Sequence, residues 1–121
     1  MKYLLMIYQD EKARAAETEA QRSQLMGEYM QFMKEIQASG HMRAGEPLRP
    51  SSMATCVRVQ DGKRMVTDGP YAETREQLGG YFLIEAKDLD EAIGIAARIP
   101  GARMGTIEVR PIAQMPVAAN A

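Results

Sequence analysis

The amino-acid sequence predicts an α+β domain of the ferredoxin-like (split βαβ) class, with an antiparallel sheet, two helices on one face and an inserted β-hairpin. Three observations support this prediction. The segments follow the order β-α-(short β)-β-hairpin-β-α-β, which becomes β-α-β-β-α-β once the hairpin is set aside. An Asp-Gly pair separates two strand segments, which is a strong hairpin signal. Two further strand segments are apolar on both faces, as in the centre of a covered sheet.

The length and composition are those of one ordinary globular domain. The chain has 121 residues, of which 45% are hydrophobic and 26% charged, so it can bury a core without disulfides or metals. The formal net charge of -1, with dispersed Lys and Arg, argues against nucleic acid and anionic membranes as partners. No apolar run approaches the roughly 20 residues of a membrane helix, and none fits a signal peptide, so we expect a cytoplasmic protein.

The first strand and the first long helix are predicted from apolar spacing. Residues 2–8 are apolar on both faces, as in a central strand. Thr18 and Gln21 form a capping box ahead of a helix over 19–39, and Gly40 is a left-handed stop for it. The apolar stripe of this helix and the methionines expected to widen it are Leu25, Tyr29, Phe32 and Ile36, with Met26, Met30 and Met33.

The middle of the chain predicts a hairpin that ends in a tight bend. After an extended segment, an alternating run predicts a half-buried strand. Asp61-Gly62 supplies the hairpin turn and leads into a second short strand, "KRMVT". The Asp68-Gly69-Pro70 bend then ends that strand, because proline cannot donate to a ladder.

The last third of the chain predicts a strand, a helix and a strand. The first strand covers 79–86 and the last covers 105–112. Asp88 and Glu91 form a cap pair at the start of the helix between them, and Pro100 ends it. The residues expected on the buried face of this helix are Leu89, Ala92, Ile93 and Ala96.

Both sheet faces need cover, which predicts a partner. We assign residues 1–112 to one domain, and residues 113–121 to a flexible tail that has nothing to pack against. The apolar side chains of the central strands alternate, so they cannot all face the helices. A second copy of the chain is the economical cover for the other face, and we therefore expect a homodimer.

Four stretches together carry a family resemblance. They are Asp68-Gly69-Pro70-Tyr71, the opening "MKYLLMIYQDE", the segment "SGHMRAGEPLRPS" and the run "ETREQLGGYFLIEAKDLDEA". Spanning roughly residues 1 to 112, they resemble the YCII-related family, specifically its DGPF branch, which is named for an Asp-Gly-Pro-Phe signature. This resemblance implies a ferredoxin-like domain that dimerises into an α+β barrel.

The same resemblance implies little about activity. The wider YCII-related group carries a His-Asp pair proposed to act in a pocket, with the histidine in the first helix. This sequence has no histidine there, and its helix offers Glu28, Tyr29 and Glu35 instead. DGPF proteins are also often encoded beside extracytoplasmic-function sigma factors, which suggests a regulatory setting without defining a role.

Two residues are candidates for proton transfer. Asp68 fits a strand-ending turn in which its carboxylate accepts backbone N–H groups, and it also fits an acid or base at a pocket mouth. His41, the one histidine of the chain, fits a helix-capping side chain and also a general acid or base. We favour the structural role for both residues. The single cysteine, Cys56, and the lone histidine predict no metal site.

Two functional hypotheses follow, from different classes. In the first, the dimeric barrel encloses a pocket that binds or transforms a small polar or aromatic molecule, without a cofactor, and whether catalysis occurs stays open. In the second, the protein is a non-catalytic regulatory module for a partner such as a sigma factor. The residues expected at the pocket are Asp68 and His41 as catalytic groups, with Gly69, Pro70, Tyr71, Tyr29 and Glu85 as ligand contacts.

Overall fold

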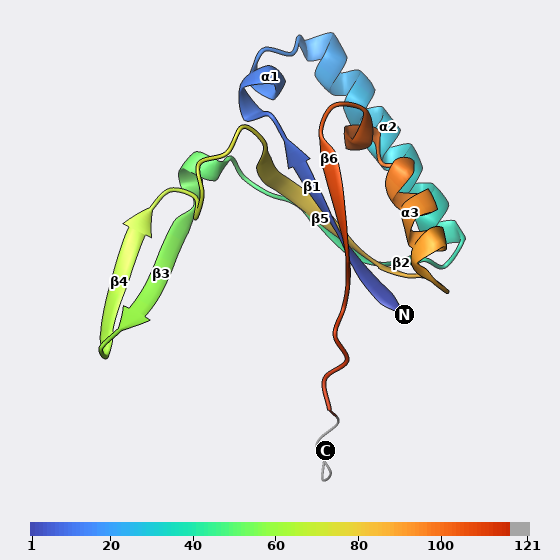
Figure 1. Ribbon diagram of the computed structural model, residues 1–121. Helices are drawn as coiled ribbons and strands as arrows, with labels where there is room; N and C mark the ends of the chain where they lie inside the picture. The colour runs from blue at the N-terminus through green and yellow to red at the C-terminus, as the bar shows by residue number, and fades with distance from the viewer. Residues whose placement is uncertain (117–121) are drawn as a thin grey trace.

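The computed structural model describes residues 1–116 and contains a four-stranded antiparallel sheet in the order β2-β5-β1-β6, covered by helices on one face (Figure 1). Strands β3 and β4 form a separate two-stranded sheet. The strand order is compatible with the ferredoxin-like arrangement. The strands are β1 (Lys2–Gln9), β2 (Met42–Pro47), β3 (Thr55–Gln60), β4 (Lys63–Asp68), β5 (Gln77–Glu85) and β6 (Thr106–Pro111). The helices are α1 (Glu11–Ala15), α2 (Glu19–Ala38) and α3 (Leu89–Ala97), with short 3-10 turns at η1 (Ser51–Met53) and η2 (Pro100–Arg103).

The local capping and turn signals are confirmed. The Thr18 hydroxyl accepts from the Gln21 backbone at 3.1 Å, and the Gln21 side chain accepts from the Thr18 backbone at 2.8 Å. Gly40 follows α2 with a positive φ of 81°. Asp61 and Gly62 both have positive φ, 51° and 73°, as a type I′ hairpin turn requires. Each signal depends on neighbours in sequence, which is why it can be predicted without knowledge of the tertiary structure.

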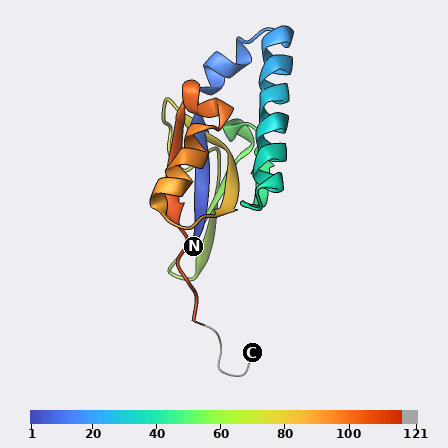
Figure 2. The same cartoon turned by 90° about the vertical axis from the view of Figure 1, so that its right-hand side faces the viewer.

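The hydrophobic core lies between the sheet and the two long helices. Figures 1 and 2 show α2 and α3 on the same side of the sheet. The Phe32 ring of α2 meets the Phe82 ring of β5 edge to face, with centroids 5.2 Å apart. No charged or polar residue is buried within residues 1–116. The residues of the core cluster are Tyr3, Leu5, Ile7, Phe82, Ile84 and Ala86, with Phe32, Ile36, Ala92, Ile95, Ala96 and Ile99.

Parts of the predicted helix faces were wrong. Met26 and Met30 are each 61% exposed and do not widen the buried stripe of α2. On α3, Leu89 and Ile93 are about half exposed, and Ile95 is buried instead. Successive helical residues are turned by about 100°, so neighbouring apolar positions define several overlapping stripes. The orientation of each helix on the sheet decides which of these stripes is buried.

The opposite face of the main sheet is apolar at its centre. Leu4 of β1 pairs with Leu83 of β5, and Met6 pairs with Tyr81. These four side chains are only partly buried, because α2 and α3 both pack on the other face. We call this surface the open sheet face. Among residues 1–116 no helix covers it (Figure 1).

The β3–β4 hairpin projects away from the main sheet (Figure 1). Val57 of β3 lies opposite Val66 of β4, and these side chains are 60% and 57% exposed. Val59 is 71% exposed. Two strands alone are marginally stable in water, so this apolar surface is unusual for an isolated protomer.

The last backbone contact of the main sheet follows β6. The backbone N–H of Ile112 donates to Lys2 at 2.9 Å, which joins the end of the sheet to its first strand. Residues 113–116 of the expected tail have no regular structure and are exposed. The remainder of that tail, residues 117–121, lies outside the described residues.

Candidate functional site

The first candidate site is a cleft between the base of the hairpin and the end of the main sheet. It has a volume of about 570 Å³ and mostly apolar walls, and we call it the DGPY cleft. Tyr8 and Leu78 line it from the open sheet face, where they pair across β1 and β5. Pro70 and Tyr71 line it from the bend after β4. The remaining lining residues are Leu48, Arg49, Pro50, Ser51, Met53, Ala54, Ala72, Thr74, Glu76 and Gln77.

Backbone contacts hold the bend beside this cleft. The N–H of Gly69 donates to the carbonyl of Ala54 at 2.7 Å, which closes the base of the hairpin. The Cys56 thiol donates to the Gly69 carbonyl at 3.3 Å. Gly69 has a φ of 103°, a conformation that L side chains rarely adopt. A glycine is therefore required where the chain turns from β4 into the cleft wall.

Contacts from distant segments support the other walls. The backbone N–H of Ser51 donates to a Glu11 carboxylate oxygen at 2.9 Å, and the Ser51 hydroxyl donates to the other oxygen. The Thr106 hydroxyl donates to Glu76 at 2.8 Å. The cleft is thus lined by three segments that are far apart in sequence, at residue 8, residues 48–54 and residues 70–78.

Only two of the four predicted Asp-Gly-Pro-Tyr residues line the cleft. Pro70 and Tyr71 line it, and Tyr71 is 92% exposed. Asp68 is the last residue of β4, opposite Thr55, and its exposed side chain does not line the cleft. The role of Asp68 in ligand contact therefore stays a prediction.

The second candidate site is a smaller hollow between α2 and the helix-facing side of the sheet. Its volume is about 260 Å³, and we call it the helix-side hollow. Tyr29 lines it, and burial raises the pKa of this phenol, with the Gly101 backbone partly opposing that shift. Arg14 also lines it. The two hollows share Leu48 in their walls. Tyr29 and Tyr71, expected in one pocket, thus line different ones.

The other two predicted site residues lie elsewhere. His41 follows α2, and its Nε2 atom is 3.0 Å from Glu91 Oε1 in the first turn of α3. Glu85 is at the far end of β5, paired with Lys2, and lies 3.6 Å from the N-terminal ammonium. Its Oε2 atom is buried without a hydrogen-bond partner among the described residues. Neither residue lines the DGPY cleft or the helix-side hollow.

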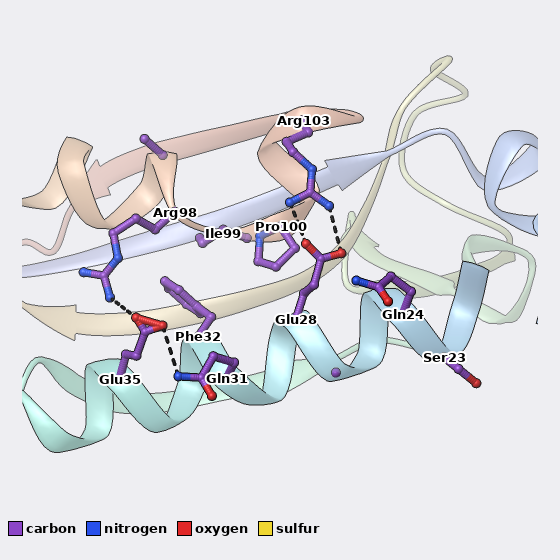
Figure 3. Close-up of a pocket in the computed structure, with 12 residues that line it drawn as sticks. Ser23, Gln24, Glu28, Gln31, Phe32, Glu35, Arg98, Ile99, Pro100 and Arg103 are labelled. Atoms are coloured by element: carbon purple, nitrogen blue, oxygen red, sulfur yellow. Dashed lines mark hydrogen bonds and ion pairs between the residues drawn. The ribbon is translucent and has the colours of Figure 1, made fainter. Parts of the chain in front are cut away.

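A third hollow, an open groove between α2 and the α3–η2 segment, is crossed by two ion pairs (Figure 3). Glu28 lies 2.8 Å from Arg103, and Glu35 lies 3.3 Å from Arg98. The hydrogen bond from Arg103 lowers the pKa of the Glu28 carboxyl. Because each arginine is matched by a carboxylate, the groove has no uncompensated charge with which to attract a ligand. We interpret these ion pairs as contacts that stabilise the packing of α2 against the α3–η2 segment.

Several residues of these sites were missed by sequence reasoning. Arg14 lies in a polar segment without periodicity, and Arg49 lies in an irregular loop, so neither carried a signal. The sequence pattern placed Tyr8 in the first strand and gave it no role in a site. Its position at the end of a two-faced strand, on the face away from the helices, is a signal that could have identified it.

Two structural features are absent from the described residues. Within residues 1–116 no group of three or more His, Cys, Asp or Glu side chains could hold a metal ion. In the same part of the chain, no helix is long and apolar enough to cross a membrane.

Comparison with known proteins identifies the family. The model of the YCII-related domain matches residues 1–116. The chain belongs to the YCII-related family. This YCII-related protein is also similar to an uncharacterized protein of Rhizobium meliloti (strain 1021), with 33% identity over 115 residues that cover 93% of each chain. The family match and the relative span the whole fold but name no activity for the YCII-related chain.

Proposed function

We propose that this protein is a homodimer that binds a small polar or aromatic molecule in the DGPY cleft. The observation that carries the proposal is that Tyr8 of the sheet and Tyr71 of the bend line one mostly apolar space of about 570 Å³. Arg49 adds a cation, and Glu76 adds a carboxylate. Apolar walls with a few polar groups are typical of small-molecule sites.

The open sheet face supports the homodimer. Leu4, Met6, Tyr81 and Leu83 form an apolar surface of the kind that a monomeric domain seldom leaves in water. Two such faces packed about a twofold axis would give an α+β barrel, as expected for the DGPF branch. Tyr8 lies on this face too, so dimerisation would bring the second copy close to the cleft.

Native mass spectrometry of freshly purified protein tests both parts of the proposal. We expect a dimer that carries an additional small mass, and the compound released on denaturation identifies the ligand class. Tyr71→Ala should reduce that occupancy. Leu89→Ala, a change at an exposed apolar residue of α3, is the matched control and should not.

Two outcomes would contradict the proposal. A monomer at micromolar concentration would exclude the dimeric barrel. An empty dimer, together with no chemical-shift change at the cleft when a panel of one-ring aromatic compounds is added, would remove the small-molecule site.

A second candidate function is a regulatory module that binds a protein such as a sigma factor. The exposed valines of the β3–β4 hairpin favour it, since a projecting apolar hairpin suits a protein contact. An affinity pull-down from the native cell, with Val57→Lys as the comparison, tests it. Recovery of a sigma factor with the original chain but not with the variant is the expected result. Recovery of this chain alone counts against it.

A further inference from the structure

We propose that the helix-side hollow is a second binding site, for a small carboxylic acid with an apolar or aromatic body, whose carboxylate is held by Arg14. This site is separate from the DGPY cleft and does not depend on dimerisation. The shape of the hollow, the way Arg14 is held and the position of Gly79 in the wall support this assignment.

The hollow suits a compact and largely apolar molecule. Its volume of about 260 Å³ is below the roughly 300–1,000 Å³ that is typical for drug-sized ligands. Most of its lining area is apolar, and the Tyr29 ring stands within the wall. A one-ring or short-chain body fits these dimensions. The apolar residues of the wall are Ile7, Met26, Met33, Pro47, Leu48 and Phe82.

Arg14 is held in place before any ligand arrives. Its Nε atom donates to Glu17 at 2.8 Å, and its Nη1 atom donates to the side chain of Gln9 at 2.7 Å. These two acceptors come from the end of β1 and from the segment before α2. A guanidinium has five donors in a planar fork, so two bonds leave others for a carboxylate. Arg14 is about one-third exposed, which leaves it open to a ligand at the mouth.

Gly79 accounts for the position of Gln9. A Cβ atom at Gly79 would collide with the amide end of the Gln9 side chain. Gly79 thus leaves room for Gln9 beside β5, and Gln9 accepts a hydrogen bond from Arg14. Gly80 has a different role, because a Cβ atom there would lie 3.1 Å from the Glu46 carbonyl oxygen of β2. Gly79 therefore helps to position the guanidinium through Gln9 and does not itself contact the carboxylate.

The other charges near the hollow define the ligand further. Glu17 neutralises part of the Arg14 charge, so binding of an anion depends on hydrogen bonds more than on net charge. Glu46 lines the mouth, but it is exposed, and its repulsion of an anion is screened by salt. A monocarboxylate suits this balance better than a dicarboxylate or a phosphate.

Titration of ¹⁵N-labelled protein with phenylacetate, and with the neutral isostere phenylacetamide, tests the proposal. With phenylacetate we expect backbone amide shift changes at Gln9, Tyr29, Gly79 and Gly80. Phenylacetamide should bind at least about tenfold more weakly, because it lacks the charge-assisted hydrogen bonds. Arg14→Gln should weaken phenylacetate binding by a similar factor and leave binding of the amide unchanged. Arg43→Gln, at an exposed arginine whose hydrogen bonds are to the backbone, is the control.

A second pair of variants keeps the test valid if Arg14→Gln does not fold. Met26 and Met30 are equally exposed on α2, but only Met26 lines the hollow. Met26→Glu should therefore repel phenylacetate, and Met30→Glu should not. Equal binding of acid and amide, no binding of phenylacetate, or shift changes confined to the DGPY cleft would each overturn the proposal. Arg49→Gln changes the DGPY cleft and not the helix-side hollow. Phenylacetate binding that is lost in Arg14→Gln but kept in Arg49→Gln therefore belongs to the hollow, whether or not the proposed function holds.

Discussion

The Nε2 atom of His41 lies 3.0 Å from Glu91 Oε1, and this contact joins the end of α2 to the first turn of α3. The Nδ1 atom of the same ring lies 2.6 Å from the Ser39 hydroxyl. Glu91 Oε1 also accepts from the backbone N–H of Lys87 at 3.1 Å. The one histidine of the chain is therefore engaged at both ring nitrogens, in a link between two helices.

Replacement of His41 should weaken this link without affecting the candidate sites. For His41→Ala we expect a fall in Tm of about 2–5 °C, the size expected when one or two partly exposed hydrogen bonds are lost. Ligand binding at either hollow should stay unchanged. Thermal unfolding and a ligand titration on the same sample measure both effects. Loss of binding with an unchanged Tm would instead support the catalytic role predicted from the sequence.

The Glu28–Arg103 pair should make stability sensitive to acid. The pKa of Glu28 is lowered from 4.5 in the folded state, chiefly by the hydrogen bond from Arg103. The stabilisation is therefore present above the pKa of the unfolded chain, and it is lost as the pH falls through the lower folded-state pKa. Glu28→Gln should reduce Tm at pH 7, and its difference from the original protein should shrink below pH 4.5.

A matched comparison makes this acid test specific. Glu73→Gln changes an exposed carboxylate in the loop before β5, and among residues 1–116 Glu73 forms no ion pair. Its Tm profile between pH 3 and 7 should follow that of the original protein. A constant Tm difference for Glu28→Gln across this range would show that charge pairing does not cause the effect.

Asp68 and Gly69 should respond differently to substitution. Asp68 is exposed and does not line the DGPY cleft, so Asp68→Asn should leave both Tm and binding in that cleft nearly unchanged. Loss of binding with an unchanged Tm would support the catalytic role predicted from the sequence. A large loss of stability instead would show that the carboxylate is structural. Urea unfolding and the native mass spectrum of the variant distinguish these results.

Gly69→Ala should weaken the base of the hairpin. The φ of 103° at Gly69 is strained for any L residue, at a cost of order 1–3 kcal/mol. Nothing lies within 4 Å of the added methyl group, so the effect should come from the backbone alone. Hydrogen exchange of the β3 and β4 amides should become faster, while exchange in β1 and β5 stays slow. Gly94→Ala, in α3, is the control, because nothing lies near its Cβ either and its φ is not positive.

A charge on the open sheet face should separate the proposed dimer. Leu83 pairs with Leu4 at the centre of this face, and Leu83→Lys would place an unpaired charge in the interface, which is strongly unfavourable. Sedimentation should show a monomer, or at least a tenfold weaker dimer. Ile93→Lys, at a half-exposed position of α3, should remain a dimer. A dimer in both variants would mean that another surface carries the association.

Most of the secondary structure could be predicted because its signals are local. The Thr18–Gln21 capping box, the Asp61-Gly62 turn and the Asp88 cap all depend on hydrogen bonds between residues at most three positions apart. The alternation of side chains along β1 and β5 also depends only on neighbouring residues, and it indicated two apolar faces. Long-range packing did not have to be known for any of these inferences.

The chain sequence by itself determined the order of the strands and the two longer helices, their caps and turns, and the apolar character of both faces of the central strands. Only the tertiary structure decided that Tyr71 and Tyr8 line one cleft, that Tyr29 lies in a different hollow and that Glu28 pairs with Arg103, 75 residues away. Local hydrogen bonds and side-chain periodicity follow from neighbouring residues. The rotation of a helix about its axis, and the contacts between distant loops, follow from the packing of the whole core, which no short stretch of sequence encodes.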